Sequence, residues 1–241
     1  MADAILREKE DDVTTITLNR PEVGNRLTDA QLQDLAGMID ASANDSKLTV
    51  LKSAGPDFCL GREAMGQQPP HIEAYAMRER IDVILNLYGA FRRSQVPIIG
   101  AVQGKAAGLG CAIAALCDVT LATSDARFQL PEMAHKIMPS LAMSALIDRV
   151  PRKALMYLVY STEEIGAELA LSFGLVSRVV PAGKLEPELA EFIQKLRPYS
   201  AAALMGVKEY ASAAYEMNAS GATTFARNIH ATINSSSAIR G

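Results

Sequence analysis

Residues 97–123 read PIIGAVQGKAAGLGCAIAALCDVTLAT, and this stretch decides the fold. The short apolar segment PIIGAV predicts a buried strand, and DVTLAT predicts a further strand at the other end of the stretch. Between them, Gly104, Gly108 and Gly110 lead into a helix of small apolar residues. From Gly108 to Cys117 there is no charged side chain, so any chemistry in this part of the stretch must belong to its backbone.

The glycines lie where a helix begins, and this position favours an anion site. The first turn of a helix leaves backbone N–H groups without partners at the positive end of the helix dipole. Gly108 and Gly110 remove side chains there, so the N–H of Leu109 can reach a developing negative charge. An oxyanion hole normally needs two donors, and the N–H of Arg62, after the turn at Gly61, is the second candidate. The alternative is that the glycines only permit tight helix packing.

The rest of the chain predicts one α/β domain with a helical extension. Val13–Leu18 alternates as a half-buried strand, and Thr28 with Gln31 forms a capping box that opens a helix. Residues 61–72 contain glycine and two prolines, and we expect a mobile surface segment there. From Ser140 the pattern is helical almost to the end. The further expected elements are strands at Leu48–Leu51 and in ARFQ (126–129), and a helix at Glu73–Arg93 with Ile81, Ile84, Leu85, Tyr88 and Phe91 inward.

Composition excludes several classes of protein. The net charge is only −3, which gives no field for nucleic acid or for an anionic membrane. The three cysteines and three histidines are scattered without metal-binding spacing, so we expect reduced thiols and no metal site. The longest apolar run, Ala106 to Cys117, is shorter than the roughly 20 residues of a membrane span. The N-terminus lacks an apolar signal core, so we expect a cytoplasmic protein.

Four motifs together resemble the crotonase (enoyl-CoA hydratase/isomerase) superfamily. They are NRPE (19–22), GPDFCLGRE (55–63), the central block from Val96 to Glu132, and ALSFGLVSRVVP (170–181), and the match covers residues from about 13 to 235. The resemblance implies a spiral of ββα units over residues 1–190 and a C-terminal helical trimerisation region over 191–241 that lacks the family's last helix. It also implies a homotrimer or a dimer of trimers. The implied substrate is an acyl-CoA thioester, and no separate cofactor is implied because the substrate carries the CoA.

The resemblance also implies roles for particular residues. The amides of Arg62 and Leu109, next to Gly61 and Gly108, would hold the thioester oxygen as an enolate forms. Hydratases of the family carry two glutamates, but the first position is Ala112 here and only Glu132 remains. One carboxylate can still move a proton between two carbons, so the favoured reaction is double-bond isomerisation. The alternatives are an enoyl-CoA hydratase, an acyl-CoA hydrolase, and a CoA-binding subunit whose chemistry has decayed.

Other residues have weaker expectations. His135, one helical turn after Glu132, is a possible proton partner. Asp118 matches a structural aspartate of the family. Met138, Leu141 and Met143 would make one wall of the acyl pocket bulkier than in the family. The cations expected near the CoA are Arg26, Arg20 and Lys105, with the side chain of Arg62 as a further phosphate contact.

Overall fold

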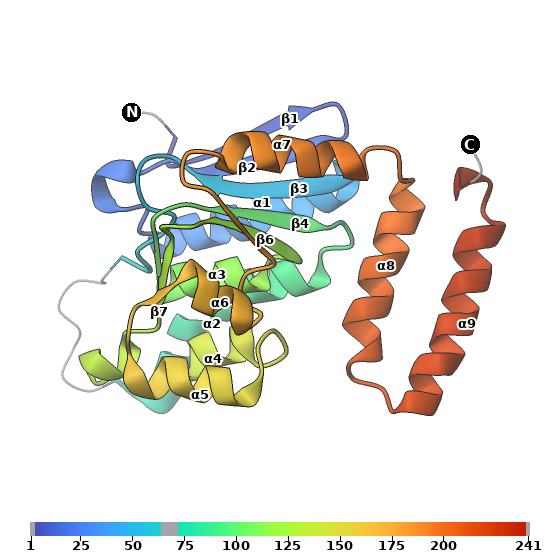
Figure 1. Ribbon diagram of the computed structural model, residues 1–241. Helices are drawn as coiled ribbons and strands as arrows, with labels where there is room; N and C mark the ends of the chain where they lie inside the picture. The colour runs from blue at the N-terminus through green and yellow to red at the C-terminus, as the bar shows by residue number, and fades with distance from the viewer. Residues whose placement is uncertain (1–2, 64–71, 240–241) are drawn as a thin grey trace.

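The computed structural model describes residues 3–63 and 72–239, and in these ranges six strands form the main sheet. The strand order is β1-β2-β3-β4-β6-β9 (Figure 1). β1 and β2 are antiparallel and every later pair is parallel. Parallel neighbours need crossover connections, which explains why helices separate these strands in the chain. The strands are β1 (Ile5–Glu10), β2 (Val13–Leu18), β3 (Leu48–Ser53), β4 (Ile98–Val102), β6 (Val119–Thr123) and β9 (Arg178–Val180).

A small second sheet lies beside the main sheet and places the glycine-rich segment. Its order is β5-β7-β8, formed by β5 (Lys105–Ala107), β7 (Arg127–Gln129) and β8 (Ile165–Gly166). Helix α3 (Leu109–Leu116) follows β5 after the single residue Gly108, and all of its residues are buried. The β4, β5, α3, β6 order repeats the strand–strand–helix unit that the resemblance implied.

Helices cover both faces of the main sheet. Helix α7 (Leu185–Leu196) packs Leu185 and Leu189 on one face, and the larger core, with α1, α2 and α3, lies on the other (Figure 1). The capping box of α1 is present: the Thr28 hydroxyl accepts from the Gln31 N–H, and the Gln31 side chain accepts from the Thr28 N–H. The remaining helices are α1 (Asp29–Asp45), α2 (Ala74–Arg93), α4 (Ser140–Leu146), α5 (Arg152–Ser161), α6 (Ala167–Ser172), α8 (Ala201–Ala214) and α9 (Ala219–Ser235), with short 3-10 turns η1 (Pro21–Val23), η2 (Glu132–His135) and η3 (Ser237–Ile239).

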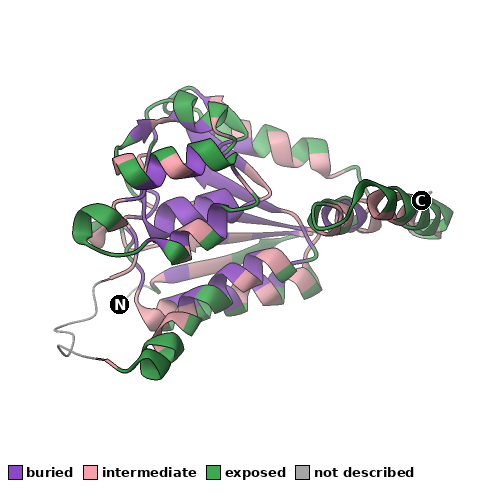
Figure 2. Ribbon diagram, turned by 90° about the horizontal axis from the view of Figure 1, so that it is seen from below, coloured by how far each residue is buried: buried purple, intermediate pink, exposed green. Residues whose placement is uncertain are grey.

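The C-terminal hairpin of α8 and α9 projects from the core (Figures 1 and 2). One buried cation ties it down: Lys208, only 7% exposed, donates to the Asp118 carboxylate at 2.8 Å and to the Val96 carbonyl at 2.9 Å. Burial lowers the pKa of Lys208, and Asp118 raises it in part. Asp118 also accepts from the Ile98 N–H at the start of β4, so it holds strand and hairpin together.

Most of the expected elements are confirmed. β1, β5, β8 and β9 were not predicted, and β8 and β9 interrupt the region expected to be helical after Ser140. In α2, Ile84, Tyr88 and Phe91 are buried as expected, but Leu85 is an exposed side chain. Residues 64–71 of the expected surface segment lie outside the described residues. Helix α7 crosses the expected boundary at residue 190, and that boundary stays a prediction.

Within the described ranges, no helix combines the length and apolar character that crossing a bilayer requires.

Two of the central glycines are needed for backbone packing. A Cβ atom at Gly110 would come closer than 3.0 Å to the carbonyl group of Cys59, and one at Gly104 would meet the carbonyl of Pro56 in the same way. The tight-packing interpretation is therefore correct for these two positions. Gly108 differs, because a Cβ there would meet only the side chain of Glu132, at 3.3 Å.

We expect Gly110→Ala to lower the free energy of unfolding by about 1–3 kcal/mol, because the added methyl overpacks against backbone that cannot turn away. Gly37→Ala is the matched control: it also lies inside a helix, α1, and nothing occupies the space of its Cβ within 4 Å. That control should be stabilising by about 0.5–1 kcal/mol. Urea unfolding of both variants measures the difference, and equal stabilities would contradict the packing argument.

Candidate active site

The glycine-rich segment borders a cavity of about 520 Å³. Its wall combines the loop after Leu60, the inner face of α2, the first residue of α3, and the segment from Pro131 to Ala142. These pieces are far apart in the sequence, and the two sheets and α2 bring them together. The cavity is lined by Arg26, Leu60, Gly61, Arg62, Glu63, Ile84, Tyr88, Gly108, Leu109, Pro131, Glu132, His135, Ile137, Met138, Pro139, Leu141 and Ala142.

The amide of Arg62 is oriented by the strand-like pairing of its neighbours. Gly61 accepts from the Leu27 N–H at 3.1 Å, and the Glu63 N–H donates to Leu27 at 2.8 Å. In a parallel bridge of this kind, the residue between the two bonds points its own N–H and C=O to the other side. The Arg62 N–H therefore points away from Leu27.

Leu109 lies across a short gap from this loop. Gly61 has φ +108°, and a Cβ at Gly61 would lie 4.0 Å from the Leu109 nitrogen and 3.3 Å from the Ala107 carbonyl oxygen. Leu109 is the first residue of α3, and its N–H makes no hydrogen bond to any residue that the structure describes. Both amides belong to residues that line the same cavity. Two such donors could stabilise a negative oxygen between them.

Glu132 is the first residue of the 3-10 helix η2, and its side chain approaches Gly108. Its Oε2 atom is buried and finds no hydrogen-bond partner in the described part of the chain, and its Oε1 atom lies next to the space above Gly108. Burial raises the pKa of Glu132, while its own backbone N–H and the charge of His135 lower it in part. A partly desolvated carboxylate of this kind is suited to accept a proton.

At the second carboxylate position of the family, this chain has Ala112, whose methyl side chain cannot carry a proton. Ala112 is fully buried and does not border the cavity, and its N–H bonds to the Gly108 carbonyl within α3. The nearby thiols do not replace it, because burial raises the pKa of Cys59 and of Cys111 to about 12. Both sulfurs therefore stay protonated and behave as small apolar groups.

His135 and the apolar wall lie nearer to solvent. His135 is an exposed side chain that borders the cavity, within electrostatic reach of Glu132. Met138 and Leu141 border the cavity as expected, together with Ile137, whose side chain is largely exposed. Met143 does not: it packs against the core instead.

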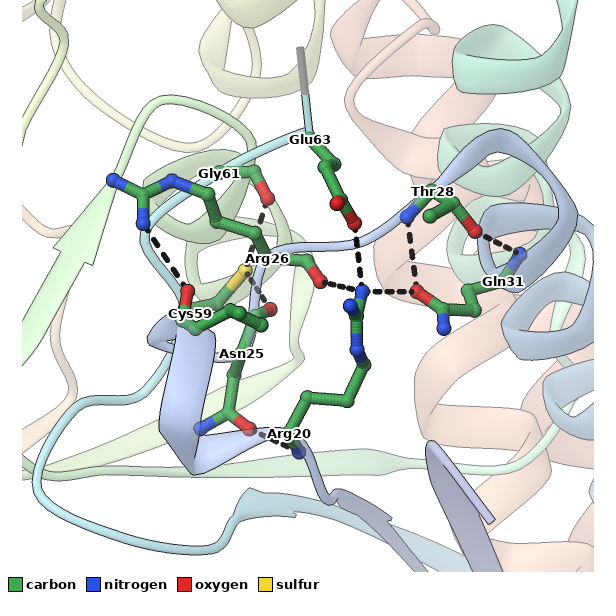
Figure 3. Close-up of polar contacts among 9 residues, drawn as sticks. Arg20, Asn25, Arg26, Thr28, Gln31, Cys59, Gly61 and Glu63 are labelled. Atoms are coloured by element: carbon green, nitrogen blue, oxygen red, sulfur yellow. Dashed lines mark hydrogen bonds and ion pairs between the residues drawn. The ribbon is translucent and has the colours of Figure 1, made fainter. Parts of the chain in front are cut away.

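Of the expected cations, Arg26 and Arg62 line the cavity, and Arg20 and Lys105 do not. Arg26 lines the cavity, and its guanidinium donates to the Val23 carbonyl. Arg20 does not line it: its guanidinium binds the Glu63 carboxylate at 2.8 Å and also donates to Gln31 and to the Arg26 carbonyl (Figure 3).

Two further cations have carboxylate partners as well. The Arg62 side chain forms a two-bond ion pair with Asp29, both bonds at 2.7 Å. Lys105 pairs with Glu164 at 2.7 Å and does not border the cavity. Contacts between CoA and the side chains of Arg20, Arg62 and Lys105 stay predictions. In each such contact, the cation would have to bind a CoA phosphate and its carboxylate partner at the same time.

Tyr88 is a site residue that the sequence did not reveal. Its spacing from Ile84 on α2 assigned it to the core, and the residue is only 4% exposed. The same inner face of α2 borders the cavity, with Ile84 and Tyr88 in its wall. A hydroxyl on an otherwise apolar helix face was the one available signal, because a buried phenol normally needs a partner.

A second cavity, of about 490 Å³, lies where α8 meets the core, and it is less suited to chemistry. Several of its charged groups are paired with one another, Lys208 with Asp118 and Arg92 with Asp148. The first cavity therefore remains the candidate site.

Comparison with known proteins gives a consistent result. A family model described as enoyl-CoA hydratase/isomerase matches residues 8–241. The chain is 31% identical to 2,3-dehydroadipyl-CoA hydratase of Escherichia coli (strain K12), covering 85% of this chain and 80% of that protein. It is 32% identical to the short-chain-enoyl-CoA hydratase of Clostridium acetobutylicum, covering 80% and 74%. It is also 31% identical to the human mitochondrial enoyl-CoA hydratase domain-containing protein 3, but the match spans only 63% of that protein's length.

Solved structures agree with the sequence relatives. An enoyl-CoA hydratase of Mycobacterium smegmatis superposes with a TM-score of 0.89 at 28% identity, over 96% of this chain and 91% of that one. The human enoyl-CoA hydratase domain-containing protein 3 superposes with a TM-score of 0.87 at 25% identity, over 95% and 91%. The resemblance to the crotonase superfamily is thus confirmed by sequence and by fold, and the chain belongs to the enoyl-CoA hydratase/isomerase family.

Proposed function

We propose that the protein is an acyl-CoA enzyme that moves a carbon–carbon double bond, with Glu132 as its single proton-carrying group. One observation supports this most directly: one carboxylate, with an oxygen that has no partner among the described residues, faces the same cavity as the amides of Arg62 and Leu109. The family's second carboxylate position, Ala112, contributes only a buried methyl group.

The proposed reaction needs only these groups. With a β,γ-unsaturated acyl-CoA bound, Glu132 removes a proton from the carbon next to the thioester carbonyl. The electron pair moves onto the thioester oxygen, where the two amides stabilise the enolate. The protonated Glu132 then returns its proton to the γ-carbon, the electrons shift back, and the double bond lies between the α- and β-carbons. The thioester acidifies the α-carbon, so this sequence needs no further cofactor.

A hydratase is the second candidate, because the relatives at 31% and 32% identity from E. coli and C. acetobutylicum are named hydratases. Hydration needs a water molecule held beside the β-carbon, and family hydratases hold it between two carboxylates. With Glu132 alone, we expect water addition to be slower than proton transfer.

The oligomeric state and the cellular location of the protein are further proposals. We propose a homotrimer or a dimer of trimers built through α8 and α9, which is supported by the projection of this hairpin and by the lack of any buried residue in α9 (Figure 2). A cytoplasmic location is supported by three buried, unpaired cysteines, which suit a reducing compartment.

Glu132→Gln should lower the isomerisation rate by about 10²–10⁴-fold, the usual contribution of a general base. CoA affinity should be unchanged, and the melting temperature should be unchanged or higher. Burial raises the pKa of Glu132, so its ionised form destabilises the folded state above that pKa, and glutamine removes this penalty. The assay follows the absorbance of the conjugated thioester formed from a β,γ-unsaturated acyl-CoA.

The control for this experiment is Glu168→Gln, the same chemical change on an exposed residue of α6. It should retain wild-type turnover. If Glu132→Gln kept its rate within threefold, the base would lie elsewhere. If the wild-type protein hydrated a conjugated enoyl-CoA quickly and did not isomerise, the hydratase candidate would replace the isomerase.

His135→Gln should move the acidic limb of the kcat/KM profile to higher pH. A charged His135 lowers the pKa of Glu132, so removing that charge raises this pKa, and the carboxylate then becomes a competent base only at higher pH. Profiles of wild-type and variant protein in buffers of constant ionic strength measure the shift. A limb that stayed in place, or moved to lower pH, would show that His135 does not act on the proton-accepting group.

A further inference from the structure

Arg20 connects the two segments whose pairing orients the amide of Arg62. Its Nη1 atom donates to the Arg26 carbonyl at 3.0 Å and to the Glu63 carboxylate at 2.8 Å (Figure 3). The Arg26 carbonyl adjoins Leu27 in the chain. Glu63 directly follows Arg62, the residue that forms a parallel bridge with Leu27. One guanidinium therefore holds together the two sides of this bridge.

Arg20 is itself held in place by hydrogen bonds within the chain. Asn25 is 1% exposed, and its side-chain oxygen accepts from the Arg20 N–H at 2.8 Å. The Asn25 N–H donates in return to the Arg20 carbonyl at 2.9 Å. The Asn25 side chain also donates to the carbonyls of Ala54 and Asp57, at 2.9 and 2.8 Å. The Gln31 side chain, which belongs to the capping box of α1, accepts from Arg20 Nη1 at 3.2 Å.

The ion pair between Arg20 and Glu63 is suited to hold a position more than to stabilise the fold. The two side chains are 21% and 43% exposed, and ion pairs that are this accessible contribute little to the free energy of unfolding. Reaction geometry is more sensitive, because a displacement of about 1 Å in a catalytic site can lower the rate about 100-fold. The loss of this pair should therefore affect the rate more than the stability.

The competing interpretation is that Arg20 binds a phosphate of CoA. Glu63 lines the cavity and Arg20 does not, so Arg20 reaches the site through its partner. If Arg20 bound a phosphate, Glu63 would compete with that phosphate for the same guanidinium. The two interpretations therefore predict opposite effects when the charge of Glu63 is removed.

We propose that Arg20 is a positioning residue, whose bonds to Glu63 and to the Arg26 carbonyl hold the Arg62 amide in the orientation that stabilises the enolate. This inference rests on the proposed function, in which that amide is one of the two enolate donors. Arg20 then contributes to the step in which the enolate forms, and not to the affinity for CoA.

Steady-state kinetics of the isomerisation and calorimetric titration with CoA test this. CoA lacks the thioester oxygen, so its affinity does not depend on the enolate donors. Arg20→Met should lower kcat by about 10–100-fold, with the Kd for CoA and the melting temperature unchanged. Arg20→Lys should recover part of this loss, because a single ammonium can pair with Glu63 but lacks the planar fork of arginine.

Glu63→Gln is the second variant, and its near-identical shape protects the fold. It should lower kcat by about 3–10-fold, since the amide oxygen still accepts a hydrogen bond but carries no charge. The double variant should be no slower than Arg20→Met alone, because both changes remove the same interaction. Arg93→Met is the matched control: it breaks a similarly accessible ion pair, with Asp40, and should leave kcat unchanged.

The other outcomes overturn the inference. Weaker CoA binding by Arg20→Met with kcat retained, together with tighter CoA binding by Glu63→Gln, would show a phosphate contact. A kcat within twofold of wild type in both variants, or losses that multiply in the double variant, would show that the pair does not act as one positioning unit. A fall in melting temperature that accompanied each loss of activity would show a purely structural pair. If wild-type protein turned over neither a β,γ-unsaturated nor a conjugated enoyl-CoA, the proposed function would fail and this inference with it.

Discussion

The close approach of the first turn of α3 to the segment around Cys59 is the contact on which the site depends. Gly110 lies directly against the carbonyl group of Cys59, and Gly104 lies against that of Pro56, so no side chain of any size fits at either position. This contact brings the loop at Gly61 next to Leu109, so that residues from distant parts of the chain border one cavity. Backbone donors placed in this way need no reorganisation when charge develops, and this is the main advantage of such a site.

The candidate site contains a partly buried carboxylate, and this feature costs stability. Glu132 is held in a partly apolar wall that raises its pKa, and its Oε2 lacks a partner among the described residues. Gly108 is the residue that makes room for it, since any side chain there would press on Oε1. Proteins keep such destabilising arrangements where a ligand completes them.

The ion pairs of the expected cations could not be predicted from local sequence patterns. Arg20, Arg62 and Lys105 were all expected near the CoA because each adjoins a motif of the family. Their side chains bind Glu63, Asp29 and Glu164, and each of these partners is distant in sequence from its cation. Whether a cation is available to a phosphate depends on which carboxylates the fold brings within reach, and no local pattern contains that information.

The sequence by itself determined the α/β class, the capped helix α1, the central strands and the glycine-rich entry to α3, because periodicity, capping and glycine spacing are local properties. Glu132 was singled out only through the resemblance to the crotonase superfamily. The sequence did not reveal β8 and β9, which are two and three residues long and exist only because β7 and β6 offer edges for pairing. It did not reveal Tyr88 either, since a helix face that packs in the core and a helix face that lines a cavity have the same spacing. Only the tertiary structure decided which buried positions border empty space, because a cavity is formed by segments that no stretch of sequence contains together.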